Sequence, residues 1–380
     1  MADKNGPLHG IRILDLTSFV FGPYATQILG DLGADVVKIE PPGGEHHRTV
    51  QKNTKAGNTS SSFVALNRNK RSLTLDLKSE EGRAKLAALI PTADVFIHNL
   101  RAEAIARLGF GYEAVAKRNP AIVYAQCVGF GSGGPYAPRM GFDDLVQAAS
   151  GATDLLARVN GDGEMRLLPS YFADKVSGLH AVYSVVAALF HHGRTGEGQF
   201  VEIPMLECFT SFLMVEHLYG ETFEPSLSHM GNSLVLAADR KPLRTKNGYI
   251  CVQPVSLSQA AKFMALGGIP DAYTSERILS APGGKAKMAV HFEMMQEAAL
   301  TKTTEEWMRL GEEHRVAIMR ANTLEEVLDD PHLKAVDFFQ VRNLPGENRW
   351  RATKPPVTFS KTPASIRLDP PKPGANNDEF

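Results

Sequence analysis

The first 130 residues of the chain alternate between two hydrophobic periods. Short apolar segments rich in β-branched residues are typical of strands, and five of them occur, at residues 11–17, 35–40, 72–77, 94–100 and 121–130. Helix-like segments lie between several of these strands, at residues 24–32, 80–89 and 102–108. Ser79 is a suitable N-cap for the second of these helices. This alternation predicts an α/β fold, with a Rossmann-like, mostly parallel sheet that carries helices on its faces.

A second pattern, of helical period, follows Asp174. Its apolar positions recur at steps of three and four residues, at Val176, Leu179, Tyr183, Val186 and Phe190. His191, His192 and Arg194 follow, where cations suit the end of a helix, and Gly193 is a suitable C-cap. The pattern predicts one long apolar helix that begins close to Asp174.

The remaining sequence predicts a division into domains. Residues 1–224 carry the strand and helix alternation and form the predicted large domain. Residues 225–332 change to loop, strand and mixed helix and form a predicted smaller domain. Residues 333–380 are rich in proline, which predicts an extended C-terminal tail that returns to the large domain.

Composition narrows the class of partner and the compartment. The 380 residues include 43% hydrophobic and 22% charged residues, and Lys plus Arg total 41 against 42 for Asp plus Glu, a net charge of −1. This balance argues against nucleic acid or an anionic membrane as an obligate partner. Three cysteines lie far apart without the spacing of a metal site, which suits a reducing cytoplasm. The longest apolar run is about half the ~20 residues of a membrane span, so we expect a cytoplasmic protein.

The glycines bear on which ligand the sheet binds. The loop after the first strand contains one glycine followed by Pro23, which disfavours the Gly-x-Gly-x-x-Gly loop of dinucleotide-binding folds. Glycines gather instead in residues 129–144, after the fifth strand. That segment has two interpretations, a flexible crossover loop or a place where backbone approaches a ligand at the carboxyl ends of the strands.

Basic residues suggest an anion site near the same strands. Arg68, Lys70 and Arg71 precede the third strand, and Arg139 lies in the glycine-rich segment. The segment that follows the fourth strand contains Asn99, Leu100 and Arg101. These cations have two interpretations, a solvated surface or a cluster that neutralises phosphate groups.

Asp174 likewise has two interpretations, which are compatible. It is suited to N-cap the helix that it precedes. The same position would keep a carboxylate ionised and aimed, which is what a carboxylate nucleophile requires.

An ordered set of motifs along the chain resembles the class III coenzyme A transferases, a family that includes formyl-CoA transferase-like members and is also called CaiB/BaiF. The set begins with "LHGIRILDLTSFVFGPYATQILGDLGADVVKIEPPGGEHHR", "NKRSLTLDLKSEEG" and "ADVFIHNLRAEAIARLGFGYEAVAKRNPAIVYAQCVGFGSGGP". It continues with "DDLVQAASG", "RTGEGQFVEIPMLE", "DPHLKA" and "PPVTFSKTP". The resemblance covers nearly the whole chain.

The resemblance implies a six-stranded Rossmann-like large domain, a smaller domain and an interlaced homodimer. It implies that coenzyme A moves from an acyl-CoA to a free carboxylic acid, with coenzyme A as substrate and with no permanently bound cofactor or metal. Asp174 matches the family's nucleophile. The motifs "NKRS" and "NLR" match its CoA-binding segments, and residues 18–21, including Phe19 and Val20, match the loop beside the CoA chain. Some transferases have glutamine at the position of Val20, so the resemblance does not imply that this chain uses the same acid substrates.

Two other activities remain open. An α-methylacyl-CoA racemase of the same fold would pair the aspartate with a histidine at the position matching Phe142. His180 is the nearest substitute, although we expect it to be a packed core residue, and we expect His46 and His47 at the surface. The second alternative is a catalytically silent CoA-binding protein.

Overall fold

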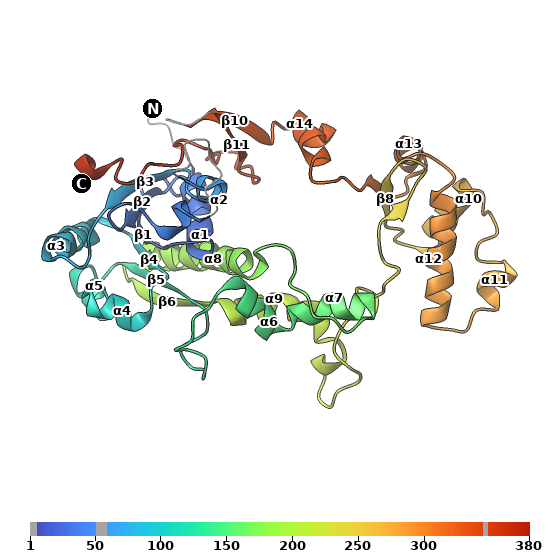
Figure 1. Cartoon of the computed structure of the whole chain (residues 1–380), viewed down its shortest axis with the longest axis horizontal. Helices are drawn as coiled ribbons and strands as arrows, with labels where there is room; N and C mark the ends of the chain where they lie inside the picture. The colour runs from blue at the N-terminus through green and yellow to red at the C-terminus, as the bar shows by residue number, and fades with distance from the viewer. Residues whose placement is uncertain (1–5, 51–58, 345–348) are drawn as a thin grey trace. The chain divides into compact units, whose positions relative to one another are not determined.

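The computed structural model describes residues 6–50, 59–344 and 349–380. The chain forms two compact units. The colours of Figure 1 follow residue number, so the segments that belong to each unit can be found in it. The first unit contains the residues up to Leu156, Glu164–His217 and Asp337–Phe380. The second contains Ala157–Gly163 and Leu218–Val336.

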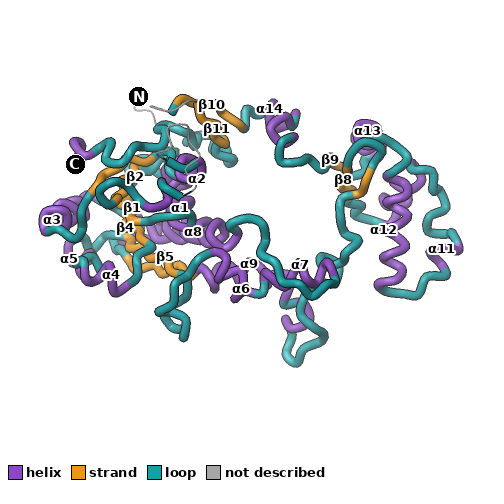
Figure 2. The backbone as a smooth tube through the Cα atoms, in the orientation of Figure 1, coloured by secondary structure: helices purple, strands orange, loops and turns teal. Residues whose placement is uncertain are grey.

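A six-stranded sheet is the centre of the first unit (Figure 2), with the strand order β3-β2-β1-β4-β5-β6. Its strands are β1 (Arg12–Leu16), β2 (Asp35–Glu40), β3 (Lys70–Thr74), β4 (Val95–His98), β5 (Val123–Val128) and β6 (Gln199–Pro204). Each neighbouring pair is parallel. The predicted α/β class with a parallel, Rossmann-like sheet is therefore confirmed. In this order, β1 and β4 lie side by side at the point where the chain reverses direction across the sheet, which is where such folds bind ligands.

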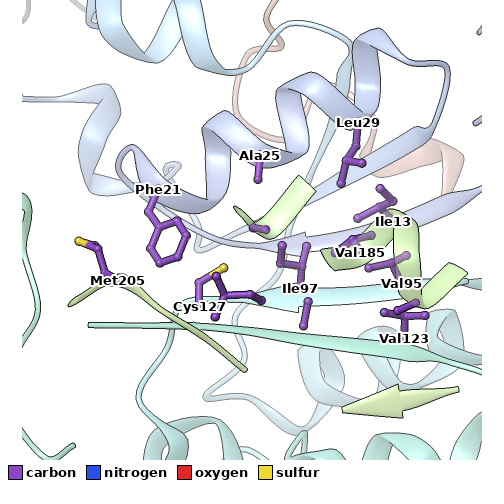
Figure 3. Close-up of a cluster of buried hydrophobic side chains, with 14 of the residues drawn as sticks. Ile13, Phe21, Ala25, Leu29, Val95, Ile97, Val123, Cys127, Val185 and Met205 are labelled. Carbon is purple, nitrogen blue, oxygen red and sulfur yellow. The ribbon is translucent and has the colours of Figure 1, made fainter. Parts of the chain in front are cut away.

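Helices cover both faces of the sheet. One face packs on α1 (Phe21–Asp31), α8 (Phe172–Thr195) and α9 (Met205–His217), whose buried side chains form one core with Ile13, Val95 and Val123 (Figure 3). The opposite face packs on α3 (Glu80–Leu89), α4 (Ala102–Arg107) and α5 (Tyr112–Arg118), in a second core that contains Leu14 and Tyr124. Adjacent strand residues such as Ile13 and Leu14 enter different cores because side chains alternate across a strand. The remaining helices of this unit are α2 (Ser61–Leu66), α6 (Asp143–Ser150) and α7 (Ala152–Asn160), the last of which crosses into the second unit.

Element boundaries agree with local sequence rules, and the differences from the predictions at α1, β3 and α8 have physical reasons. Ser79 caps α3, accepting the N–H of Gly82, as predicted. Helix α1 begins three residues early, because Pro23 is tolerated in a first turn. Strand β3 comprises Lys70–Thr74 and not residues 72–77, since its pairing with β2 ends where Glu40 lies opposite Thr74. Helix α8 continues past Gly193 to Thr195 and ends at Gly196, whose φ of 78° is the left-handed conformation of a C-cap.

The apolar stripe of α8 lies on the helix face opposite the sheet. The buried face consists of small or branched residues, among them Gly178, Ala181 and Val185. The predicted stripe is instead exposed along most of its length, at Leu179 (50%), Tyr183 (58%), Val186 (36%) and Phe190 (66%). His180 is half-buried, and its Nδ1 donates to the Val176 carbonyl at 2.9 Å, so the expectation of a core histidine is wrong.

The C-terminal segment packs on the first unit. It contains the antiparallel pair β10 (Phe339–Asn343) and β11 (Arg349–Thr353). Arg367 donates to the carbonyls of Gly30, Gly33 and Ala34, where α1 ends. Asn376 pairs with the backbone of Ser72, so this segment covers part of the free edge of β3.

The second unit contains a three-stranded antiparallel sheet and several helices around their own core. Its strands, in the order β7-β8-β9, are β7 (Leu243–Arg244), β8 (Tyr249–Val252) and β9 (Ile318–Arg320). Its helices are α10 (Leu257–Leu266), α11 (Glu276–Leu279), α12 (Lys285–Ala299), α13 (Thr304–His314) and α14 (Pro331–Ala335). Trp307 and Phe263 lie in the core with ring centroids 4.5 Å apart. In the described parts of the chain, no helix combines the length and the apolar character that crossing a bilayer would require.

Candidate active site

The loops that follow β1 and β4 meet at the carboxyl edge of the sheet. Asn99 holds both backbone groups of Ser18: its Oδ1 accepts the Ser18 N–H at 3.0 Å and its Nδ2 donates to the Ser18 carbonyl at 2.8 Å. The next residue, Phe19, has a φ of 67°, which is strained for a residue with a bulky side chain. Glu45 accepts the Phe19 N–H at 3.0 Å. Two polar side chains from different segments therefore hold this loop in its strained conformation.

Buried ion pairs also hold the loop that follows β1. Lys38 is fully buried, donates to the Thr17 carbonyl at 2.9 Å and pairs with Glu45 at 2.7 Å. Lys70 is also buried and pairs with Asp15 at 3.0 Å. Burial alone would raise the pKa of Asp15, but Lys70 and Lys38 lower it to about 2. These ion pairs explain why charged residues occur inside predicted strands: they fix the loop after β1.

Asp174 is the third residue of α8 and does not cap it. The N-cap residue is Tyr171, and its side chain accepts no capping hydrogen bond. The backbone N–H of Asp174 donates instead to Oδ1 of Asp143, at 3.0 Å. The prediction of an N-cap is therefore wrong by three residues, and the Asp174 carboxylate is not used for capping.

The electrostatics of Asp174 also differ from the expectation. Burial, followed by the charges of Asp143 and Asp144, raises the pKa of this carboxyl from 3.8 to about 7. A helix N-terminus favours the ionised form, but desolvation and two like charges outweigh it. The carboxyl group of Asp174 therefore titrates near neutral pH, and a pKa shifted in this way is common at functional sites.

Helix α8 brings Asp174 beside the loop after β1. A Cβ added at Gly178, one turn after Asp174, would lie 3.0 Å from the carbonyl oxygen of Phe21, so glycine permits a close approach of α8 to the start of α1. Asp143 follows Phe142, whose ring lies 6.4 Å from that of Phe19 in an edge arrangement. The strained loop, the start of α6 and the start of α8 therefore converge.

Aromatic and histidine side chains surround this convergence. Phe19 and Phe142 are exposed by 37% and 47%. The ring of Phe19 lies 6.0 Å from His46 and 5.8 Å from His47. His46 is exposed as expected, but His47 is buried, and burial lowers its pKa. The position at which a racemase would carry its histidine holds Phe142, which cannot take a proton.

The glycine-rich segment is ordered by hydrogen bonds and by one close backbone contact. A Cβ at Gly141 would lie 2.2 Å from the Cα of Gly129, so only glycine fits where the two ends of the loop meet. The N–H of Gly131 donates to Glu207 and that of Ser132 to Glu202. The loop is therefore held to β6 and α9, and Gly129 and Gly141 have a packing role.

The structure separates the predicted basic residues into two groups, and the first lies away from the carboxyl edge. Lys70 and Arg71 begin β3, at the amino edge of the sheet. The three Lys70 donors bond to Asp15, Asn67 and the Pro23 carbonyl. Because β3 and β4 run in the same direction, Lys70 and Arg71 at the start of β3 lie at the edge of the sheet opposite to Arg101, which follows the end of β4.

The two arginines of that group are also occupied. Arg68 is 5% exposed, and its guanidinium bonds to Asp31 and to the Thr353 carbonyl. Arg71 pairs with Asp35 at 2.6 Å and with Glu379 at 2.7 Å. These contacts tie the sheet to α1 and to the C-terminal segment, and a role of these residues in CoA binding stays an untested prediction.

The second group lies past the carboxyl ends of the strands. Arg101 is exposed directly after Asn99 and Leu100, before the first turn of α4. Arg139 is exposed and stacks on Tyr136, 4.3 Å from the ring centroid. Lys78, which sequence reasoning missed, is exposed four residues after β3. Its position directly after the predicted strand of residues 72–77 is the signal that could have identified it.

Within the described residues, no group of His, Cys, Asp and Glu side chains is arranged to hold a metal ion. The three cysteines are free.

Comparison with known proteins gives one consistent result. The sequence model described as CoA-transferase family III matches residues 8–377. A succinate–glutarate CoA-transferase of Agrobacterium fabrum is 30% identical over 386 residues, covering 98% of this chain and 94% of that protein. A probable fatty acyl-CoA transferase of Mycobacterium tuberculosis, Rv3272, is 28% identical over 98% of this chain and 97% of its own length.

Solved structures agree with the sequence comparison. A CaiB/BaiF family protein from Brucella suis superposes with a TM-score of 0.84 at 29% identity, covering 99% of this chain and 98% of that one. The crystal structure of Rv3272 gives a TM-score of 0.81 at 28% identity, with 99% of each chain covered.

Proposed function

The chain belongs to CoA-transferase family III, and from that membership we propose that it transfers coenzyme A from an acyl-CoA to a free carboxylic acid by way of Asp174. The observation that carries the proposal is the state of this carboxyl group. The Asp174 carboxylate does not cap α8, the backbone N–H of Asp174 donates to Asp143, and the pKa of the carboxyl is raised to about 7. A carboxylate with a raised pKa is a stronger nucleophile than an ordinary one, and near pH 7 about half of it is ionised.

The proposed reaction needs no proton transfer. An oxygen of the Asp174 carboxylate attacks the thioester carbonyl carbon and the C–S bond breaks. CoA departs as the thiolate, and the donor acyl group is now joined to Asp174 in a mixed anhydride. The thiolate then attacks the aspartyl carbonyl, which releases the donor acid as carboxylate and leaves an aspartyl-CoA thioester. The acceptor carboxylate attacks the carbonyl carbon of that thioester, the C–S bond breaks, and CoA thiolate is released as a second anhydride forms. The thiolate finally attacks its acyl carbonyl, which yields the new acyl-CoA and restores Asp174.

Coenzyme A carries phosphates that require cations, and the carboxyl edge of the sheet offers them. Arg101 and Arg139 are exposed there, and Lys78 follows β3 on the same edge. We assign the CoA phosphates to these three side chains, in keeping with the place where parallel sheets bind nucleotides and with the donor geometry of arginine. The loop with Phe19 and Val20 would lie along the CoA chain, on the side of Asp174.

A racemase is disfavoured by a specific contact. Moving an α-proton from one face to the other requires a base on each face. Phe142 stands at the start of α6, packs against Phe19 and has no titratable group. The half-buried carboxyl of Asp174, with its raised pKa, likewise disfavours a silent CoA-binding protein, because binding alone gives no reason to place an acid there.

We also propose a homodimer. The stripe of α8 that contains Leu179, Tyr183 and Phe190 is exposed along the single chain, and Phe212 (53%) and Val215 (84%) expose further apolar surface on α9. An apolar helix face of this length is unfavourable in water. A second copy of the chain would bury it.

The test is an exchange assay. A panel of acyl-CoAs and free acids is incubated with the protein, and new thioesters are followed by mass spectrometry. Transfer by the wild type and its loss in Asp174→Ala, with CoA binding retained, is the expected result. Exchange of the α-proton of a branched acyl-CoA with solvent deuterium, without transfer, would replace the proposal by the racemase. Binding without either reaction would replace it by the silent CoA-binding protein.

A further inference from the structure

A buried hydrogen-bond relay joins α6 to the first turn of α8. Its centre is Asp143, which is 5% exposed and accepts the backbone N–H of Asp174 on Oδ1 at 3.0 Å. Its other oxygen, Oδ2, accepts from Nε2 of Gln147, one turn further along α6, at 2.6 Å. Both oxygens of this carboxylate are therefore committed, and its orientation is determined.

Gln147 anchors the relay to the segment that leads into α8. It is 1% exposed, and its Oε1 accepts the N–H of Leu168 at 2.8 Å. Its Nε2 also donates to the Ser170 carbonyl at 3.1 Å. The same amide thus fixes both the approach of the chain to α8 and the direction of the Asp143 carboxylate.

The relay caps the N-terminus of α8, a role that a side chain at the helix's own N-cap position usually has. The N-cap residue of α8, Tyr171, provides no side-chain acceptor, and Asp143 supplies one from a different helix. The choice of a carboxylate is electrostatically unfavourable, because Asp143 adds a like charge beside Asp174. A neutral acceptor would cap the helix without that repulsion, so stability alone does not account for the residue.

We propose that Asp143 is a positioning residue for the nucleophile. Its carboxylate, oriented by Gln147, fixes the backbone at Asp174 and with it the direction from which the Asp174 carboxylate reaches the thioester carbonyl. The inference rests on the proposed transferase function. A positioning error of about 1 Å can cost about 10²-fold in rate.

The chain offers a matched control in Asp144. It is the next residue of α6, it is exposed, and its negative charge also acts on Asp174. Among the described residues it makes no hydrogen bond to α8. Asp143→Ala and Asp144→Ala therefore each remove one charge near the nucleophile, but only the first removes the hydrogen bond.

Steady-state transfer is measured for both variants across pH, with folding checked by circular dichroism. We expect Asp144→Ala to keep its maximal kcat within about twofold. Asp143→Ala should lose about 10- to 100-fold in maximal kcat, with the KM for acyl-CoA changed less than about threefold. Asp143→Asn should fall between them, because its amide oxygen still accepts the Asp174 N–H while its NH₂ group faces the Gln147 donor. Equal maximal kcat in Asp143→Ala and Asp144→Ala would overturn the proposal.

Gln147→Leu gives an independent test if Asp143→Ala does not fold. It leaves the Asp143 carboxylate in place but removes its orienting partner, so kcat should fall with KM preserved. Full kcat in both Gln147→Leu and Asp143→Asn would overturn the proposal. A wild-type protein that transfers no CoA would instead overturn the proposed function, and the two failures are thereby distinguished.

Discussion

Replacing Asp174 by asparagine should stabilise the folded protein, although it removes the proposed nucleophile. Asparagine has nearly the same shape and carries no charge. It therefore relieves the folded state of a half-buried carboxylate that lies beside Asp143 and Asp144. A residue present for structural reasons would show the opposite effect, since its loss would destabilise the protein.

The size of the effect follows from the raised pKa of Asp174. In the unfolded chain this pKa is the ordinary 3.8, and in the folded protein it is about 7. The folded protein binds the proton more tightly, so the free energy of unfolding falls as the pH rises from about 4 to about 7 and is constant above that. At about 1.4 kcal/mol per pKa unit, ionisation costs the folded state about 2 kcal/mol at pH 5 and about 4 kcal/mol at pH 8.

The assay is urea denaturation of the wild type and of Asp174→Asn at pH 5 and pH 8, at one protein concentration because association would change the midpoint. We expect the variant to be more stable at both pH values, with a gain larger at pH 8 by about 2–3 kcal/mol. Asp144→Asn, which removes an exposed charge on the same side, should change stability by less than about 1 kcal/mol. An Asp174→Asn variant that is no more stable than the wild type at pH 8 would refute the reasoning.

Four further results are expected. Arg101→Ala should raise the KM for acyl-CoA and weaken its salt dependence, with less effect on the KM for the acid; an unchanged acyl-CoA affinity would remove Arg101 from the phosphate site. Arg68→Met should lower the free energy of unfolding by about 3–5 kcal/mol, because it leaves a buried carboxylate at Asp31 without its main partner, and an increase in acyl-CoA KM without loss of stability would restore Arg68 to the binding site. Gly178→Val should destabilise the protein by about 1–3 kcal/mol by forcing α8 from α1, and a melting temperature equal to that of the wild type would contradict this packing. Sedimentation at micromolar concentration should show a dimer, and a species of only 41.4 kDa would contradict the proposed burial of the α8 stripe.

Features with a strong local signal were predictable from the sequence. The β-branched segments gave the strands of the parallel sheet, and Ser79 marked the start of α3. Asp174 was found because a lone carboxylate beside a long apolar helix matches a family motif. Each of these inferences uses residues that are close together along the chain, where local rules are reliable.

Features that depend on distant residues were not predictable. The partners of Arg68, Asp31 and the Thr353 carbonyl, lie 37 and 285 residues away along the chain, so the sequence could not show that this guanidinium is hydrogen-bonded within the fold. The cap on α8 comes from Asp143, 31 residues before Asp174. The stripe on α8 has the period of a core-facing helix, but periodicity cannot tell which partner covers an apolar face. Here α1 packs on Gly178, and the neighbouring small residue Ala181 lies in the core that α8 shares with α1 and the sheet.

The central claim is that Asp174 becomes covalently acylated, and trapping that species tests it most directly. The wild type is incubated with acyl-CoA and hydroxylamine, digested, and analysed by mass spectrometry. We predict a hydroxamate confined to the peptide that contains Asp174, dependent on acyl-CoA and absent from Asp174→Ala. Transfer of CoA by the wild type without any modification of that peptide, or with the modification on another residue, would contradict the account.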